Sequence, residues 1–248
     1  MDSLFKYTLR IADSSLILGQ RMAEWCANGP TLEEDIAMSN ISLDLFGQAN
    51  GFYEYAARLD GSKSADELAF KRNEREFFNH QLAEQENGNF GTTTVRNFLH
   101  DVFNFLFYTQ LASGKDETLA ALAAKSLKEV KYHLRHSTNW LIRLGDGTEE
   151  SNTKAQESLD LLWQYTGELF EMDEIDNELL TIGIAVDNKA LKLKWDEIVN
   201  STLKKAKLKR PEDGYMATGG KKGMHTEYLG FLLAEMQFLH RAYPDAKW

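Results

Sequence analysis

The stretch from Asp116 to Leu144 reads DETLAALAAKSLKEVKYHLRHSTNWLIRL and contains no proline. Its apolar residues recur at steps of three and four positions, at Leu119, Leu122, Ala123, Val130, Leu134, Leu141 and Leu144. Such steps place the side chains along one face of an α-helix. A helix of this length, about 40 Å, cannot bury its apolar face alone. The stretch therefore predicts a bundle in which long helices pack against one another.

The rest of the chain shows helical patterns between recognisable stop signals. Only three prolines occur in 248 residues, where average usage would supply about a dozen. Capping boxes at Thr31–Glu34 and Ser64–Glu67 mark two helix starts. We expect helices over residues 3–27, 32–59, 64–87, 92–113 and 116–144, further helices near 151–171, 188–205 and 225–242, and a shorter segment at 172–187.

These features predict an all-α protein, a ferritin-like long-helix bundle with additional C-terminal helices. The connection between Leu59 and Thr92 carries an extra helix, as expected of the long crossover in a ferritin-like bundle. The chain has no internal repeat and no flexible linker. We therefore expect a single domain over residues 1–248.

Composition restricts the partners and the compartment. The chain has 28 Lys and Arg against 38 Asp and Glu, a net charge of −10, whereas nucleic-acid binding requires a basic surface. Its single cysteine, Cys26, excludes an internal disulfide. The N-terminus lacks the pattern of a signal peptide, and no apolar run is long enough to span a membrane. We expect a cytoplasmic protein with neither a nucleic-acid nor a membrane partner.

A ferritin-like bundle invites a test for a di-iron site, which uses Glu-x-x-His pairs on two helices. No glutamate in the chain has a histidine three positions later. The nearest candidates are Glu129 and His133, four positions apart, with Asp44 on the second predicted helix. These three are interpreted as positions of a degenerate metal site, and no metal is expected.

Two interpretations of Asp44, Glu129 and His133 stay open. They are relics of a metal site or hold a substrate, or they form a hydrogen-bonded network inside the bundle, because buried charge is costly unless it is paired. The second interpretation predicts that Glu129 and His133 are buried and face Asp44. Similarly, Glu76, His80 and Glu84 stand four positions apart and form either a cation site or a row of exposed helical pairs.

Two further features concern ligands. The glycine-rich segment Thr218–Gly223 contains Lys221 and Lys222 before a predicted helix, which suits a phosphate group or a partner contact. The spacing of known phosphate loops is absent, so a plain connecting loop is equally consistent. No nucleophilic motif is present, and we predict no catalytic residue in this chain.

Several motifs together resemble one family over essentially the whole chain. They are Tyr7-Thr8-Leu9-Arg10, Leu43-Asp44-Leu45-Phe46-Gly47-Gln48-Ala49, Glu86-Asn87-Gly88-Asn89-Phe90, Lys128-Glu129-Val130-Lys131-Tyr132-His133-Leu134-Arg135, Gly183-Ile184-Ala185-Val186-Asp187 and Thr218-Gly219-Gly220-Lys221-Lys222-Gly223-Met224-His225-Thr226-Glu227. The chain is similar to the C subunits of multicomponent phenylacetyl-CoA epoxidases, also called ring 1,2-phenylacetyl-CoA monooxygenases.

The resemblance implies a non-catalytic, ferritin-like subunit in aerobic phenylacetate catabolism. It implies a partner A subunit that carries the di-iron centre, further subunits of the complex, and a reductase that uses NADPH, FAD and an iron–sulfur cluster. This chain would hold no cofactor itself. The resemblance also implies that two segments, Glu76-Phe77-Phe78-Asn79 and Asn177-Glu178-Leu179, approach the substrate phenylacetyl-CoA. Self-association of the isolated chain is left open.

Two competing functions remain. A self-sufficient ferritin-like metal oxidase would use Glu129, His133, His136 and Asp44 in an atypical metal site. An iron-storage protein would need many carboxylates on the inner faces of the bundle, which the sequence does not show.

Overall fold

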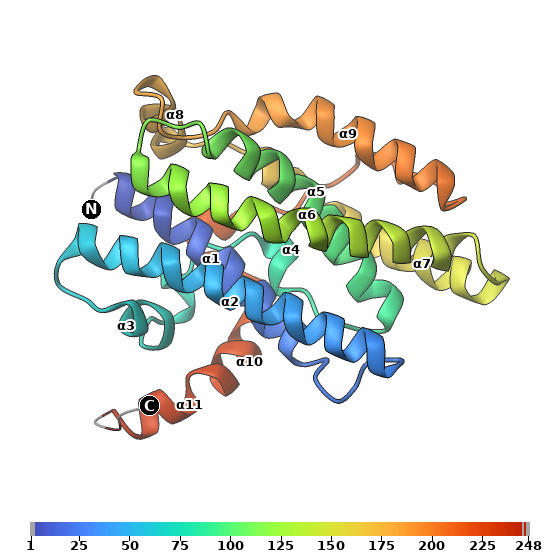
Figure 1. The fold of residues 1–248 in the computed structure, drawn as a ribbon, viewed down its shortest axis with the longest axis horizontal. Helices are drawn as coiled ribbons and strands as arrows, with labels where there is room; N and C mark the ends of the chain where they lie inside the picture. Colours follow the sequence, from blue (N-terminus) through green and yellow to red (C-terminus); the bar gives the residue numbers. More distant parts are fainter. Residues whose placement is uncertain (1–2, 245, 247–248) are drawn as a thin grey trace. The chain divides into compact units, whose positions relative to one another are not determined.

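The computed structural model describes residues 3–244 and 246, and this part of the chain contains eleven α-helices and no strand (Figure 1). The all-α class with long helices of the ferritin-like type is confirmed. The chain forms two compact units, Met1–Gln85 with Gly219–Trp248, and Glu86–Thr218. The single domain over 1–248 stays a prediction. Among the described helices, none combines the length and the hydrophobicity that a membrane span requires.

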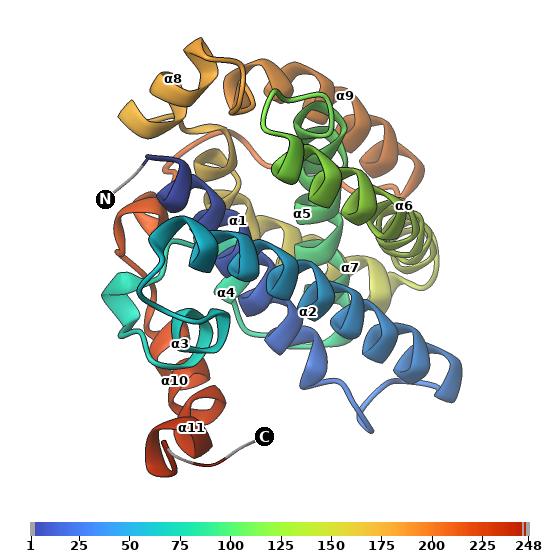
Figure 2. The same cartoon turned by 60° about the vertical axis from the view of Figure 1, so that its left-hand side comes forward.

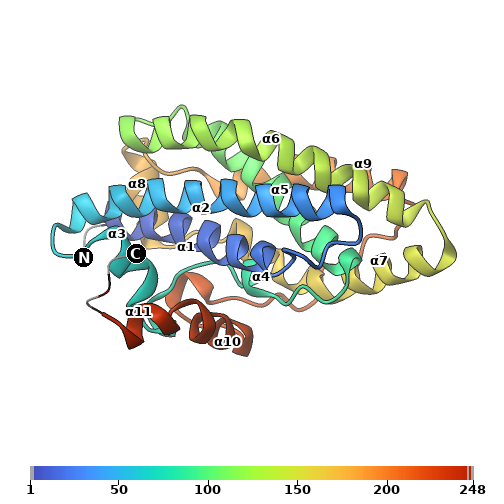
Figure 3. The same cartoon turned by 60° about the horizontal axis from the view of Figure 1, so that its bottom comes forward.

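The first unit is built on two long antiparallel helices, α1 (Ser3–Ala23) and α2 (Leu32–Asp60) (Figure 2). Their interface buries Ile17, Met38 and Phe52 completely or almost completely. The Ser42 hydroxyl on α2 donates to the Gly19 carbonyl on α1 over 2.9 Å. The unit also contains α3 (Ala65–Phe70), α4 (Gln81–Glu84), α10 (Glu227–Met236) and α11 (Phe238–Ala242), the last two shown beside α3 in Figure 3.

The helix predicted over residues 64–87 is wrong beyond its first turns. The Ser64–Glu67 capping box forms, but α3 ends at Phe70, and extended backbone at Asn73, Phe77 and His80 interrupts the rest. The cause is tertiary: the Arg72 side chain and the Phe78 amide both bind the buried carboxylate of Asp13 on α1. A helix through this segment would withdraw both donors from that carboxylate.

The helix predicted near 225–242 is divided into α10 and α11 at Gln237. The Gln237 side chain is buried, and its Nε2 donates to the Arg72 carbonyl over 3.0 Å. This bond fixes the C-terminal segment of the first unit, which begins at Gly219, to residues 64–80 of the same unit.

The second unit contains α5 (Phe90–Leu111), α6 (Glu117–Gly145), α7 (Glu149–Leu162), α8 (Glu174–Thr181) and α9 (Asn188–Lys205). Helices α5 and α6 pack as an antiparallel pair, and α9 packs on both (Figure 2). The fully buried Trp195 on α9 donates from Nε1 to the Leu99 carbonyl on α5 over 3.1 Å. The helix predicted over 151–171 ends at Leu162 and continues as two short 3-10 turns.

Gly145 and Gly47 provide a matched test of this packing. A Cβ on Gly145 at the end of α6 would lie 2.0 Å from the Ala206 carbonyl oxygen, whereas a Cβ on Gly47 of α2 would meet nothing within 4 Å. We expect Gly145→Ala to lower the free energy of unfolding by about 1–3 kcal/mol through overpacking. Gly47→Ala is expected to raise it by about 0.5–1 kcal/mol because alanine favours helix. Urea unfolding of both variants measures the difference, and equal effects would contradict the close approach at Gly145.

Candidate functional site

The predicted substrate segment Glu76–Asn79 lies in the first unit. It begins at the last residue of the 3-10 turn Glu74–Glu76, and its backbone is extended from Phe77. Glu76 is exposed and Phe78 is half-buried, whereas Phe77 and Asn79 are completely buried. Of the four side chains, only those of Glu76 and Phe78 therefore present surface to a ligand.

The first anchor of this segment is the fully buried Asp13 on α1. Asp13 Oδ2 accepts from the Phe78 amide over 2.8 Å, and Asp13 Oδ1 accepts from the Tyr53 hydroxyl over 2.6 Å. Arg72 forms a buried ion pair with Asp13 and also donates to the Glu76 carbonyl over 2.6 Å. The segment is thus attached to α1 through a charged core contact.

Burial and the Asp13 charge act together on the neighbours of this carboxylate. Burial alone would lower the pKa of Arg72, but the Asp13 charge reverses this effect and the pKa is raised. Burial, followed by the Asp13 charge, raises the pKa of the Tyr53 hydroxyl well above its usual value. Arg72 therefore stays a cation and Tyr53 stays a neutral donor, as the Asp13 carboxylate requires.

The second anchor is the fully buried Glu84 in α4. Its Oε2 accepts from Asn79 Nδ2 over 2.8 Å and lies 2.8 Å from His225 Nδ1. Its Oε1 accepts from the Thr226 amide over 2.6 Å and from the Thr226 hydroxyl over 2.8 Å. His225 Nε2 lies 2.8 Å from the Phe77 carbonyl oxygen. These contacts join the extended segment to the start of the C-terminal segment.

The glycine-rich segment before α10 packs against this region. Gly223 has φ of 76°, and a Cβ there would lie 2.2 Å from the Arg75 carbonyl oxygen. Lys221 is buried and Lys222 is exposed, so the two lysines do not form one exposed basic pair. The close approach to Arg75 accounts for a glycine at position 223 without a ligand.

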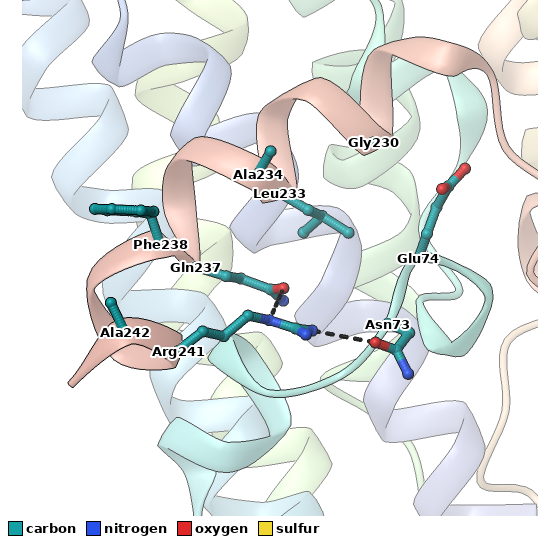
Figure 4. A pocket seen from close by; sticks show the side chains of 9 residues that line it. All are labelled: Asn73, Glu74, Gly230, Leu233, Ala234, Gln237, Phe238, Arg241 and Ala242. Carbon is teal, nitrogen blue, oxygen red and sulfur yellow. Dashed lines mark hydrogen bonds between the residues drawn. The ribbon is translucent and has the colours of Figure 1, made fainter. Parts of the chain in front are cut away.

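A groove of about 520 Å³ lies between α10–α11 and residues Asn73 and Glu74 (Figure 4). Leu233, Ala234 and Phe238 form its apolar wall. The Arg241 guanidinium donates to Gln237 Oε1 over 2.9 Å and to Asn73 Oδ1 over 3.3 Å, so it braces the wall (Figure 4). None of the side chains predicted from the sequence to form a site lines this groove.

The other predicted substrate segment lies on α8 in the second unit. Asn177 and Glu178 are exposed, and Leu179 is buried. Asn177 Nδ2 donates to the Asp173 carbonyl over 2.7 Å, within the first turn of the helix. Asn177 and Glu178 are therefore the surface residues of this segment.

The second unit has a polar interior between α5 and α6. Asp101 of α5 is buried, and its Oδ2 accepts from the buried Ser137 hydroxyl of α6 over 2.8 Å. Beside it on α5, His100 Nδ1 accepts from Asn104 Nδ2 over 3.0 Å. Arg96, on the same helix, is completely buried. Charged and amide side chains therefore occupy positions that a simple bundle would fill with apolar residues.

Burial controls the protonation of this interior. It raises the pKa of Asp101 to about 6, against the lowering effects of His133, the Ser137 hydroxyl, His136 and Arg96. Burial, with the charge of Arg96 added, lowers the pKa of His100 to about 4. At neutral pH, His100 is uncharged, while Asp101 is ionised close to the point at which it takes up a proton.

The interior does not fit a di-iron centre. His133 is buried and lies near Asp101, but Glu129 is only half-buried, contrary to the sequence prediction. Asp44 belongs to α2 of the first unit and is half-buried there. In the described residues, no group of three or more His, Cys, Asp or Glu side chains is arranged to hold a metal ion. The Arg96 cation is close enough to lower the pKa of both His100 and Asp101, and it would repel a metal ion. That Glu129 and His133 face Asp44 stays a prediction.

The series Glu76, His80 and Glu84 is neither a cation site nor a row of exposed helical pairs. Extended backbone at Phe77 and His80 breaks the helical spacing. Glu76 is exposed and its carboxylate accepts from the Asn73 amide over 2.7 Å, whereas Glu84 is completely buried. Both interpretations from the sequence are wrong because they assumed a continuous helix.

Sequence reasoning missed Asp13, Arg72, Arg96, Asp101 and the pairing of Glu84 with His225. For the second unit a signal existed: Arg96, His100 and Asn104 recur at four-residue steps, with Asn97 and Asp101 alongside. This spacing gives a polar face to a helix that is buried on nearly all sides. For the first unit no local signal existed, since Asp13 and Arg72 are 59 positions apart.

The comparisons with known proteins agree with the family resemblance. Residues 1–248 match the family described as phenylacetic acid catabolic protein. The chain is 48% identical over 248 residues to the C subunit of the 1,2-phenylacetyl-CoA epoxidase of Escherichia coli (strain K12), with 100% of both chains covered. The similarity therefore extends over both units.

The buried Asp13–Arg72 pair should be costly to break. Arg72→Met leaves the Asp13 carboxylate buried without its cation, and we expect the free energy of unfolding to fall by about 3–5 kcal/mol. Lys154→Met removes the exposed Lys154–Glu150 pair and is expected to leave it unchanged. Thermal and urea unfolding measure both variants. An Arg72→Met chain as stable as the Lys154→Met control would contradict the structural role of the pair.

Asp101 and His100 should give pH dependences of opposite sign. Asp101 binds its proton more tightly in the folded chain, so its destabilising effect is full above pH 6 and is relieved as the pH falls toward 4. His100 binds its proton less tightly when folded, so stability is lost as the pH falls from 6.5 toward 4. Asp101→Asn should therefore stabilise the chain at pH 7.5, by roughly 2–3 kcal/mol, and lose that advantage on acidification.

Urea unfolding of the parent chain and of Asp101→Asn between pH 4.5 and 7.5 tests this expectation. Asparagine retains an oxygen that accepts from Ser137, so the comparison isolates the charge. A difference in stability that stays constant over the pH range would exclude a raised pKa for Asp101.

Proposed function

The chain belongs to the phenylacetic acid catabolic protein family, and we propose that it is the structural, non-catalytic subunit of a phenylacetyl-CoA 1,2-epoxidase. The observation that carries this proposal is the 48% identity over the full length of both chains to the C subunit of such an enzyme. The relation covers all 248 residues, so it concerns both units rather than one shared motif.

The interior of the second unit supports a non-catalytic role. Metal sites in ferritin-like bundles are built from inward-facing carboxylates and histidines. Here the buried positions of α5 include the cation Arg96 and the neutral His100. Asp101 is the buried carboxylate of this helix, but no group of three or more His, Cys, Asp or Glu side chains in the described residues is arranged to hold a metal ion. The buried cation Arg96 also disfavours a second positive charge.

The catalytic chemistry is then supplied by partners. A di-iron A subunit would insert one oxygen atom from O2 into the ring of phenylacetyl-CoA, with electrons from NADPH delivered by a reductase that contains FAD and an iron–sulfur cluster. This chain would stabilise the A subunit in the cytoplasm and carry no cofactor.

The surface residues of the two predicted segments are the proposed contacts to the acyl-CoA. In the first unit these are Glu76 and Phe78, and in the second unit Asn177 and Glu178. The buried Phe77, Asn79 and Leu179 would support them from beneath. Lys222 is exposed and is proposed to contact a phosphate group or a partner subunit, with the buried Lys221 holding the loop.

Reconstitution tests the proposal. We expect the chain to co-purify with the catalytic A subunit and to elute with it as one species in size-exclusion chromatography. The complex with its reductase should epoxidise phenylacetyl-CoA, and this chain with reductase alone should form no product. The isolated chain should contain far less than one iron per molecule by elemental analysis.

A self-sufficient metal oxidase predicts the opposite results. About two irons per chain after purification without chelators, together with product from the chain and reductase alone, would establish that alternative. Glu129→Ala separates the two further, because a structural subunit should lose activity only in proportion to lost complex. A stable variant that still forms the complex but supports no turnover would place Glu129 in the reaction.

A further inference from the structure

The buried contact between Glu84 and His225 constrains where protons lie. Glu84 Oε1 accepts two hydrogen bonds from Thr226, and Oε2 accepts one from Asn79 Nδ2. The side chains of Glu84 and His225 are both completely shielded from solvent. The carboxylate therefore already has three donors besides His225.

The His225 ring faces an acceptor at each nitrogen. Nε2 lies 2.8 Å from the Phe77 carbonyl oxygen, which can only accept, so Nε2 carries a hydrogen. Nδ1 lies 2.8 Å from Glu84 Oε2. At this distance Nδ1 and Oε2 share one hydrogen. Because three other donors already face the Glu84 carboxylate, we place this hydrogen on Nδ1, so that the ring carries two hydrogens.

We propose that His225 is a buried imidazolium paired with ionised Glu84, and that this pair is a proton-dependent latch that holds the 77–80 segment against the C-terminal segment. His225 fixes the Phe77 carbonyl, and Glu84 fixes Asn79 and the first turn of α10 through Thr226. Both residues act as positioning residues for Phe78. The substrate consequence of this latch rests on the proposed function, whereas the latch itself does not.

The charged groups around the pair lie on α1, in the turn that follows α1 and in the segment that follows α3. From α1, the Arg21 guanidinium donates to the Glu84 carbonyl over 2.9 and 3.0 Å and to the Tyr228 carbonyl over 3.1 Å. Arg21 is itself paired with Glu24 at 2.7 Å. On the other side of the segment, Arg72 and Asp13 neutralise each other. The His225 proton is therefore the titrating charge that the Glu84 carboxylate contacts directly.

Loss of that proton at higher pH opens the latch. The lone pair of Nδ1 would then face the Glu84 carboxylate, and a short contact between the two segments would become repulsive. The remaining bonds of the C-terminal segment, such as Gln237 to the Arg72 carbonyl, do not involve the pair. Opening should therefore be confined to residues 77–84 and 224–228.

Two measurements on the full-length chain test the latch. The ring 15N chemical shifts of His225, assigned with His225→Gln, should show two protonated nitrogens at pH 6 to 7. Amide hydrogen exchange, corrected for intrinsic rates, should be about tenfold or more faster in residues 77–84 of His225→Gln than in the parent, as expected for a lost charged hydrogen bond. His240→Gln, on the neighbouring α11, is the matched control and should leave this exchange unchanged.

The outcomes are distinct. A neutral His225 ring at pH 6, or exchange in His225→Gln that matches the control, overturns the latch. If His225→Gln does not fold, the ring signals of the parent chain are assigned by through-bond correlation instead. In the reconstituted complex, His225→Gln should raise KM for phenylacetyl-CoA several-fold with little change in kcat, and complex formation is scored separately. If the two measurements establish the latch but His225→Gln leaves KM unchanged, the substrate role of the 77–80 segment is rejected. If the parent chain fails to assemble with the A subunit, the proposed function is rejected.

Discussion

A buried carboxylate must be given hydrogen-bond donors, and in the first unit this requirement determines the path of the chain. Asp13 accepts from Tyr53, Arg72 and the Phe78 amide, while Glu84 accepts from Asn79 and Thr226 and contacts His225. Because residues 71–80 supply some of these donors, they do not form the helix that the local sequence favours. The regular hydrogen bonds of that helix are exchanged for charged bonds in the core, which are individually stronger.

The long helices were predictable because their information is local. The helix predicted near residues 188–205 is α9 (Asn188–Lys205), and the apolar stripe over residues 116–144 predicted the long helix α6. The 64–87 region was not predictable, since its capping box indicates a helix but its continuation depends on Asp13, far away in sequence. Local propensity is overridden wherever a tertiary bond is worth more.

The candidate site divides in the same way. Asp44, Glu129 and His133 were found by their spacing, which depends only on helical geometry. The charged residues of the interior of the second unit, Arg96 and Asp101, were identified only from their burial in the structure. The four-residue spacing of Arg96, His100 and Asn104 would have indicated a polar helix face, but on its own such a face predicts solvent rather than a core. Burial and sequence must therefore be read together to recognise a charged interior of this kind.

The route of the chain through the two units has a consequence for synthesis. The second unit is continuous from Glu86 to Thr218, whereas the first unit is completed only by residues from Gly219 onward. On the ribosome, α1 and α2 emerge first. The Glu84 side chain can contact His225 and Thr226 only later, because these residues follow it by 141 and 142 positions. Contacts of such long separation form slowly because the intervening loop must first be closed. The second unit is thus expected to fold while the first is still incomplete. A chain that ends before residue 225 would leave the Glu84 carboxylate without its contacts to His225 and Thr226.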